Sequence, residues 1–309
     1  MNTAPIVLFV YNRPIHTQKV LNALLQCNLS EETELFIFSD GPKQDANFNE
    51  IKSIEDVRFI IRGISGFKKT ILVEREKNYG LGKSIIEGLD VIFQKYESAI
   101  ILEDDLVVVP TFLEYMNYYL DCYKDKKEVW HISGFQKNCW LQVFVEPVFF
   151  THFMNCWGWG TWSDRWSRLN TDVKIINNYI SCKQNKTLFD YEKLEHSEQL
   201  KLNEYEIKTW AIFWYATILM NRGLCVNPRL SLVQNIGDDG SGTNMGITTK
   251  NRIDFVGHFN INRPFLSSRI YETFLNRNFI IQAYAKNSKL SLVNFKRLIF
   301  KMSTKILAK

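Results

Sequence analysis

Between Pro5 and Phe135 the sequence alternates short apolar runs with stretches of helical periodicity, and this alternation constrains the fold more than any other feature. The apolar runs read PIVLFVYN, ELFIFSDG, KTILVERE and SAIILEDD, and each is followed by a helix-like stretch. Continuous apolar runs are typical of strands that are buried on both faces of a sheet, and crossover helices join such strands in parallel. The sequence therefore predicts an α/β fold with a mostly parallel central sheet flanked by helices.

The composition is that of a globular protein with a sizeable core. The chain has 309 residues, of which 46% are hydrophobic and 23% charged, and these proportions exclude a disordered chain. Its six cysteines form no CxxC pair and no zinc-like spacing with histidine, so we expect reduced thiols and a cytoplasmic protein. The longest apolar run, residues 210–220, is too short to cross a hydrocarbon layer of ~30 Å.

The net charge of +5 is concentrated at the end of the sequence. Residues 285–309 hold seven of the 38 basic residues and no acid, so the rest is close to neutral and a nucleic-acid-binding surface is not expected. Apolar residues recur there at spacings of three and four, namely Leu292, Phe295, Ile299, Met302 and Ile306. This pattern predicts a basic amphipathic helix, suited either to an anionic membrane surface or to packing on its own domain.

Polar residues follow each predicted strand. They are Tyr11, Asn12 and Arg13 after the first strand, Asp40 after the second, Asn78 after the third, and Glu103, Asp104 and Asp105 after the fourth. In parallel sheets the ligand crevice lies outside the carboxyl ends of the strands, so these side chains are expected along one rim. Three adjacent carboxylates repel one another unless a cation neutralises them. A divalent metal bridging them to phosphate oxygens would do so, although capping of the next helix is an alternative.

A second phosphate-binding signal is NYGLGKS, residues 78–84. It resembles the end of a P-loop, but Lys77 stands where that motif requires its first glycine, which argues against an NTPase. Gly80 and Gly82 would let a helix N-terminus and Lys83 approach an anionic ligand. A simple tight turn is the alternative.

The order of motifs is familiar. VYNRP, FSDG, NYGLG, ILEDDLVVVPTFLEYM, CWGWGTW and NIGDDGSGTN together resemble bacterial glycosyltransferases of the GT-A fold, over residues 5–245. The Glu-Asp-Asp segment is also similar to that of the Golgi N-acetylglucosaminyltransferase that initiates hybrid and complex N-glycans. The resemblance implies metal-dependent, inverting transfer of a sugar from a UDP donor to a saccharide or lipid-linked saccharide. Synthesis of a cell-surface polysaccharide or lipopolysaccharide is the implied setting.

The resemblance also implies a role for each polar residue of the rim. Asp105 would coordinate Mn²⁺ or Mg²⁺, Arg13 would contact the donor phosphates, and Asp40 would contact the nucleobase. Glu103 and Asp104 would meet the donor sugar and ribose. The other residues expected in the donor pocket are Tyr11, Asn12, Asn78, Gly80 and Lys83.

The residue that takes the acceptor's proton is ambiguous in the sequence. Related enzymes carry aspartates around a Trp-x-x-x-Trp helix, but here that stretch reads EIKTWAIFW, with Lys208 and Ala211 where acids would stand. The remaining carboxylates are Glu206, Asp164, Asp238 and Asp239. We favour Asp239, with Glu206 as second choice, because a glycine-rich loop can close over a donor and exclude water. A plain Asp-Gly turn is the alternative reading of this loop.

The aromatic residues after Phe135 supply candidates for stacking on a sugar acceptor, namely Trp157, Trp159 and Trp162, with core packing as the alternative. His131, His152 and His258 have no matched partner spacing, so structural roles are expected.

We expect three regions. Residues 1–135 form a nucleotide-sugar-binding half, residues 136–262 an acceptor-binding and catalytic half of the same domain, and residues 263–309 a helical basic extension. Two other functions remain open at this point. A nucleotidyltransferase would need a glycine-rich loop where FVYNRPIHT has none, and a non-catalytic carbohydrate-binding protein would leave Arg13 and the acidic triplet without a purpose.

Overall fold

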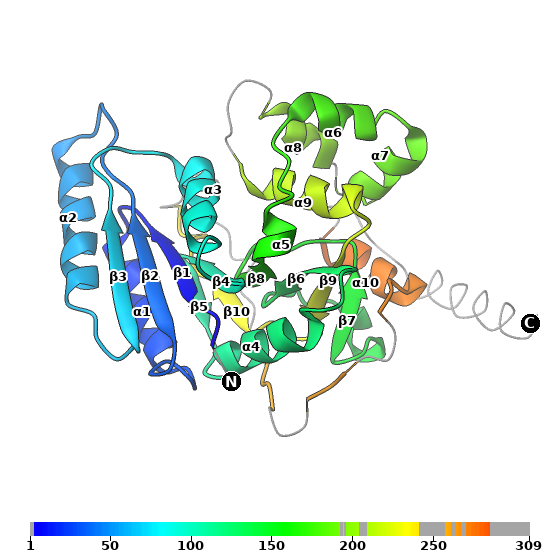
Figure 1. Cartoon of the computed structure of the whole chain (residues 1–309), viewed down its shortest axis with the longest axis horizontal. Helices are drawn as coiled ribbons and strands as arrows, with labels where there is room; N and C mark the ends of the chain where they lie inside the picture. Colours follow the sequence, from blue (N-terminus) through cyan, green and yellow to red (C-terminus); the bar gives the residue numbers. More distant parts are fainter. Residues whose placement is uncertain are drawn as a thin grey trace, which may run out of the picture.

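A mixed sheet of eight strands forms the centre of the protein (Figure 1). The computed structural model describes residues 3–191, 194, 196–203, 209–240, 257–260, 264–266 and 270–284. Within them the strand order is β3-β2-β1-β4-β8-β6-β9-β7, and β5 and β10 form a separate pair. The strands are β1 (Ile6–Val10), β2 (Glu34–Ser39), β3 (Lys69–Glu74), β4 (Ser98–Glu103), β5 (Leu106–Val108), β6 (Val129–Ser133), β7 (Val148–Thr151), β8 (Trp159–Trp162), β9 (Leu224–Pro228) and β10 (Val233–Asn235).

The two halves of the sheet differ in direction. β3, β2, β1 and β4 are all parallel, as the alternating sequence pattern predicts. β8 then runs antiparallel to both β4 and β6, β9 is parallel to β6, and β7 is an antiparallel edge strand. Four of the seven pairings are therefore parallel, which confirms a mostly parallel sheet flanked by helices. The irregular, aromatic-rich stretch after Phe135 supplies the short antiparallel strands.

Helices cover both faces of the sheet. Along β1, Ile6, Leu8 and Val10 pack into a core shared with α1, α2 and α4, whereas Val7 and Phe9 face a second core that includes α3 and α9. This two-sided burial explains why β1 is apolar at every position. The longer helices are α1 (Pro14–Leu25), α2 (Phe48–Arg62), α3 (Leu81–Ile92), α4 (Phe112–Tyr123), α9 (Ala211–Met220) and α10 (Phe274–Tyr284). Shorter ones are η1 (Trp140–Phe144), α5 (Ser163–Trp166), α6 (Val173–Tyr179), α7 (Lys183–Phe189) and α8 (His196–Lys201).

The starts of α1, α2 and α3 carry residues typical of helix N-termini. Pro14 occupies the first turn of α1, where a missing N–H costs nothing, and the Asn47 side chain caps α2 by accepting from the Glu50 N–H. α3 follows Gly80. The helical periodicity between residues 190 and 221 belongs to two helices, α8 and α9, rather than to one.

The last described helix, α10, packs on β7 and η1. Glu272 anchors the segment before it, since its carboxylate accepts from the Tyr191 hydroxyl, from the His152 N–H at 3.0 Å and from Arg277 at 3.0 Å. Phe279 of α10 is fully buried. The amphipathic helix predicted for residues 285–309 lies outside the described residues. Among the described helices, none combines the length and apolarity that a membrane crossing requires.

His131 on β6 lies in a cluster of tryptophans on one face of the sheet. Its ring stacks on Trp159 with centroids 5.2 Å apart, its Nε2 lies 2.9 Å from the Asn155 carbonyl oxygen, and its Nδ1 accepts from the Trp214 indole at 3.3 Å. The side chain is therefore a neutral, fully hydrogen-bonded core histidine, as expected from its isolated position in the sequence. Burial lowers the pKa of His131 to about 3.

Because His131 is buried in its neutral form, the folded protein should lose stability in acid, and His131 should account for part of that loss. An unfolded histidine binds a proton near a pKa of about 6.5, whereas folded His131 does so only near 3, so between these values the unfolded state binds more protons. The free energy of unfolding should fall as pH drops from about 6.5, by up to about 1.4 kcal/mol per pH unit from this residue. Urea unfolding at pH 7 and pH 5 should show a smaller difference for His131→Gln than for the unmutated protein. Equal pH dependence in both would contradict this.

Candidate active site

The carboxyl ends of β1, β2 and β4 bring the predicted rim together. β1 is the central strand of the three, with Val10 opposite Ser39 on β2 and Phe9 opposite Glu103 on β4. Arg13 follows β1, Asp40 follows β2, and the acidic triplet ends β4, so all of them emerge at one edge of the sheet.

Arg13 is held between two carboxylates of the triplet. Its guanidinium donates to Asp104 and lies 3.0 Å from Oδ2 of Asp105. Burial disfavours the charged guanidinium, but attraction to the two carboxylates outweighs this and raises the pKa of Arg13 above its ordinary value. The rim therefore carries a positively charged hydrogen-bond donor, the Arg13 guanidinium, where the sequence predicts a bound phosphate.

The triplet carries more negative charge than Arg13 offsets. Burial, reinforced by repulsion from Asp105 and Asp104, raises the pKa of Glu103 to about 8. Burial also raises the pKa of Asp104 despite its contact with Arg13. Oxygen ligands with unbalanced negative charge suit a hard divalent cation. In the described part of the chain, no three His, Cys, Asp or Glu side chains converge to enclose a metal by themselves.

Asp40 anchors the loop that precedes α3. Its buried carboxylate accepts from the backbone N–H groups of Gly41 at 3.0 Å, Tyr79 at 2.9 Å and Gly80 at 3.0 Å. Gly80 has a φ of +75°, a left-handed conformation that favours glycine. The Asn78 side chain donates to the Gly41 carbonyl at 3.0 Å, which ties the same two segments together. Asp40 and Asn78 thus shape the rim, and contact of Asp40 with a nucleobase stays a prediction.

The other predicted donor-pocket residues are less directly placed. The Tyr11 hydroxyl donates to Glu50 of α2 at 2.7 Å, and Asn12 is partly exposed between Tyr11 and Arg13. Lys83 points outward from α3, with 59% of its side chain exposed, and lies 3.5 Å from Glu87. The Lys83 ammonium nitrogen also lies 5.1 Å from the centroid of the Tyr79 ring, and the guanidinium carbon of Arg75 lies 4.2 Å from the same centroid.

The glycine-rich loop lies directly over Arg13 and Asp105. β10 pairs antiparallel with β5, with Asn235 opposite Leu106, and the Ile236 N–H then donates to the Asp105 carbonyl at 2.8 Å. A Cβ atom on Gly237 would clash with the Asp105 carboxylate and lie 3.0 Å from Nη1 of Arg13. Glycine at position 237 therefore lets the backbone of the loop come close to Asp105 and Arg13. These residues precede the loop by more than 100 positions in the sequence.

The carboxylates considered as the base have different surroundings. Asp239 has a half-exposed side chain, with Oδ2 3.2 Å from Nε2 of His16. Oδ2 of Asp238 is buried and has no hydrogen-bond partner among the described residues. Asp164 is paired with Lys127 and Arg165 on α5, and Glu206 lies outside the described residues. His16, which the sequence analysis overlooked, sits one helical turn after Arg13.

The structure contradicts an acceptor role for two of the three predicted tryptophans. Trp159 is 1% and Trp162 3% exposed, because both lie on β8, an interior strand of the sheet. Trp162 donates its indole N–H to the Leu120 carbonyl at 3.0 Å. Trp157 is partly buried and packs edge-on against Phe135 at 4.5 Å. It adjoins Cys156, whose pKa burial raises to about 12 with a contribution from Glu103.

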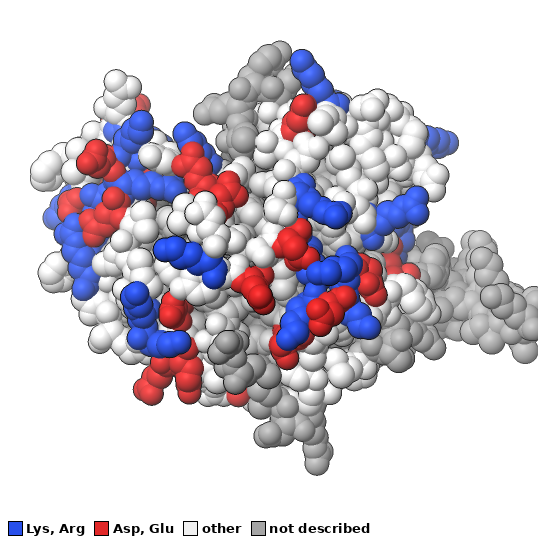
Figure 2. Space-filling model, viewed as in Figure 1, with Lys and Arg blue, Asp and Glu red and all other residues white. Residues whose placement is uncertain are grey.

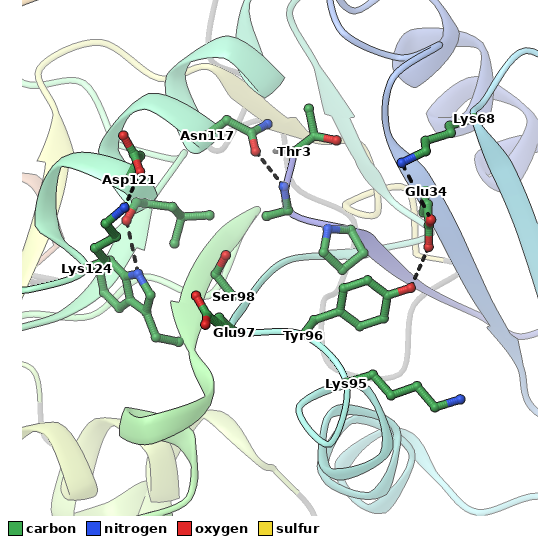
Figure 3. Close-up of a pocket in the computed structure, with 14 residues that line it drawn as sticks. Thr3, Glu34, Lys68, Lys95, Tyr96, Glu97, Ser98, Asn117, Asp121 and Lys124 are labelled. Atoms are coloured by element: carbon green, nitrogen blue, oxygen red, sulfur yellow. Dashed lines mark hydrogen bonds and ion pairs between the residues drawn. The ribbon is translucent and has the colours of Figure 1, made fainter. Parts of the chain in front are cut away.

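A separate hollow of about 650 Å³ lies at the opposite, amino edge of the sheet (Figure 3). Its wall includes Glu34 and Ser98, the first residues of β2 and β4. The charged groups around it pair with one another, Lys68 with Glu34 at 3.9 Å and Lys124 with Asp121 at 2.9 Å. Because nucleotide ligands bind at the carboxyl ends of parallel strands, this hollow is not the donor site.

Charges of both signs are mixed on the face that Figure 2 shows, with no continuous basic area on it.

Comparison with known proteins identifies the family. A scan against models of protein families matches residues 1–175, more than half of the chain, to the GNT-I family. The chain belongs to the GNT-I family. This membership confirms the resemblance to the Golgi N-acetylglucosaminyltransferase that the sequence motifs indicate.

Other comparisons add little to the GNT-I assignment. A search of curated proteins found no match. Among solved structures, the chain is similar to the crystal structure of TarS from S. aureus, with 18% sequence identity and a TM-score of 0.28. That match covers 39% of this chain and 20% of TarS, so the chain spans only a fifth of that protein's length. Such a likeness carries no argument about fold or activity.

Proposed function

We propose that this protein transfers a sugar from a nucleoside diphosphate donor, with UDP as the expected nucleotide, to a hydroxyl group of a saccharide acceptor. The observation that carries the proposal is the position of Arg13. It lies between Asp104 and Asp105 at the carboxyl edge of a parallel sheet, beneath a glycine-rich loop, in a chain of the GNT-I family. Cell-surface polysaccharide or lipopolysaccharide synthesis is the proposed setting, at the cytoplasmic face of the membrane.

The chemistry follows from where charge develops. In an inverting transfer the acceptor oxygen bonds to the anomeric carbon, and the electron pair of the breaking bond goes to the departing diphosphate. Arg13 would stabilise that growing negative charge, which is largest in the transition state. A carboxylate takes the acceptor's proton, and Asp239 is the proposed base because its loop covers the donor site.

The residues present fit a bound Mn²⁺ or Mg²⁺. Asp105 would hold the ion with its carboxylate, and the donor diphosphate and water would complete the shell, as is common for these hard cations. When bound, the ion neutralises charge on the leaving diphosphate. The geometry supports this assignment, because the single positive charge of Arg13 lies against two carboxylates, those of Asp104 and Asp105.

Thermal unfolding with nucleotide sugars tests the proposal. A donor present at about 100 times its Kd stabilises a protein by about 2.7 kcal/mol, which raises the Tm of a chain this long by several degrees. We expect this rise with UDP-sugars and Mn²⁺ together, and little change with either alone. Samples with EDTA, and with adenosine diphosphate in place of UDP compounds, are the controls. No stabilisation by any nucleotide sugar with metal, or equal stabilisation without metal, would contradict the proposal.

A further inference from the structure

His16, in α1, contacts the glycine-rich loop at Ile236 and Asp239, and Arg13 is the N-cap residue of the same helix. His16 occupies the first turn of α1 and is 9% exposed. Its Nε2 lies 3.2 Å from the Ile236 carbonyl oxygen and 3.2 Å from Oδ2 of Asp239. Both Arg13 and His16 therefore lie against the loop, at Gly237 and Asp239 respectively.

The hydrogen-bond roles at this contact follow from its partners. A backbone carbonyl and an ionised carboxylate only accept hydrogen bonds, so Nε2 must carry the hydrogen and donate. A single N–H thus faces both the backbone of the loop and the side chain of Asp239. A donor fixed in a buried helix turn can orient the carboxylate of Asp239.

The loop is held at two places. Ile236 donates its backbone N–H to Asp105 at 2.8 Å, and its carbonyl faces His16. Between these contacts and Asp239 lies Gly237, which covers Arg13 and Asp105. In the part of the chain that the structure describes, these two contacts therefore set the position of residues 236–240 relative to the donor site, and His16 also reaches the Asp239 side chain.

We propose that His16 is a positioning residue, which holds Asp239 and the loop of residues 236–240 beside the donor site. The inference rests on the proposed function, because it assigns His16 a role in the same transfer. His16 acts through Asp239, while Arg13, one helical turn earlier, holds the donor diphosphate. The N-terminus of α1 thereby fixes the position of Asp239, the proposed base, relative to the donor diphosphate.

Two substitutions separate the hydrogen bond from the shape of the ring. His16→Phe keeps a flat ring of similar size and removes the N–H, whereas His16→Gln keeps an N–H near the position of Nε2. A displaced catalytic group costs about 100-fold in rate, so kcat should fall by about that factor in His16→Phe, with the KM for donor nearly unchanged. His16→Gln should recover most of that loss. Ile15→Ala, at the exposed neighbouring position, is the matched control and should behave as the unmutated protein.

A double substitution tests whether His16 acts through Asp239. If it does, His16→Phe should have no further effect on kcat in an Asp239→Asn background, because residues that act as a unit are not additive. Fully additive losses would overturn the inference. So would a normal kcat in His16→Phe.

Hydrogen exchange gives a readout that does not need turnover. Backbone amides of residues 236–240 should exchange faster in His16→Phe than in His16→Gln or Ile15→Ala, since the loop loses one of its two anchors. Unchanged exchange would overturn the inference. If no nucleotide sugar is turned over by the unmutated protein, the proposed function fails, and the exchange experiment alone decides whether His16 holds the loop.

Discussion

Asp105→Asn is expected to lower kcat/KM by about 10³-fold and to remove the extra thermal stability that Mn²⁺ gives in the presence of donor. The substitution keeps the size of the side chain and removes the charge that would hold the cation. Arg13 retains Asp104 as a partner, so the loss should reflect the missing cation more than a displaced arginine. Steady-state kinetics and Tm values measured with donor, with and without Mn²⁺, check this.

The folded state should tolerate this change. The contact of Asp105 with the loop is made by its backbone carbonyl, which accepts from the Ile236 N–H, and pairing of β5 with β10 begins at the next residue, Leu106. The substitution lowers repulsion within the triplet and Arg13 keeps Asp104 as a partner, so without ligands the Tm should change little. Asp121→Asn, on the exposed side of α4, is the control. A strong metal effect that survives in Asp105→Asn would place the cation elsewhere.

The parallel half of the fold is predictable because its signals are local. Each of β1 to β4 contains an uninterrupted apolar run, and helix starts at Pro14, Asn47 and Gly80 carry recognisable residues. The antiparallel half is not predictable in the same way. β7, β8 and β9 have only four or five residues each, and their places in the sheet depend on partners far away in sequence. Local periodicity carries no information about such pairings.

The site residues also differ in this way. Those with a local sequence signal could be predicted, whereas those defined by a distant partner could not. Arg13 and Asp105 stand directly after strands, so the general geometry of parallel sheets is enough to bring them to one edge. The role of His16 depends on Asp239, more than 200 residues later, and only the three-dimensional structure shows their contact. Trp159 illustrates the opposite error, since a tryptophan suits a core and a sugar-binding surface equally well. Trp159 lies on β8, an interior strand of the sheet, and therefore belongs to the core.

Asp239→Asn is expected to lower kcat by about 10³-fold, within the range that a lost general base costs, and to leave donor binding intact. The amide cannot take the acceptor's proton, but it still offers an oxygen to the His16 N–H, so the loop should stay in place. The Asp239 side chain is 51% exposed, and its Oδ2 lies 3.2 Å from Nε2 of His16. The KM for donor and the stabilisation by donor and Mn²⁺ should therefore resemble those of the unmutated protein.

Asp238→Asn is the matched comparison, because it changes the neighbouring carboxylate in the same loop. Oδ2 of Asp238 is buried without a hydrogen-bond partner among the described residues, so this carboxylate is the strongest rival for the base. If Asp239 is the base, Asp238→Asn should lower kcat far less than Asp239→Asn does. The reverse result would move the proton transfer to Asp238 and leave Asp239 with the contact to His16 alone. Near-normal turnover in both variants would require a base outside the loop, with Glu206 the first to test.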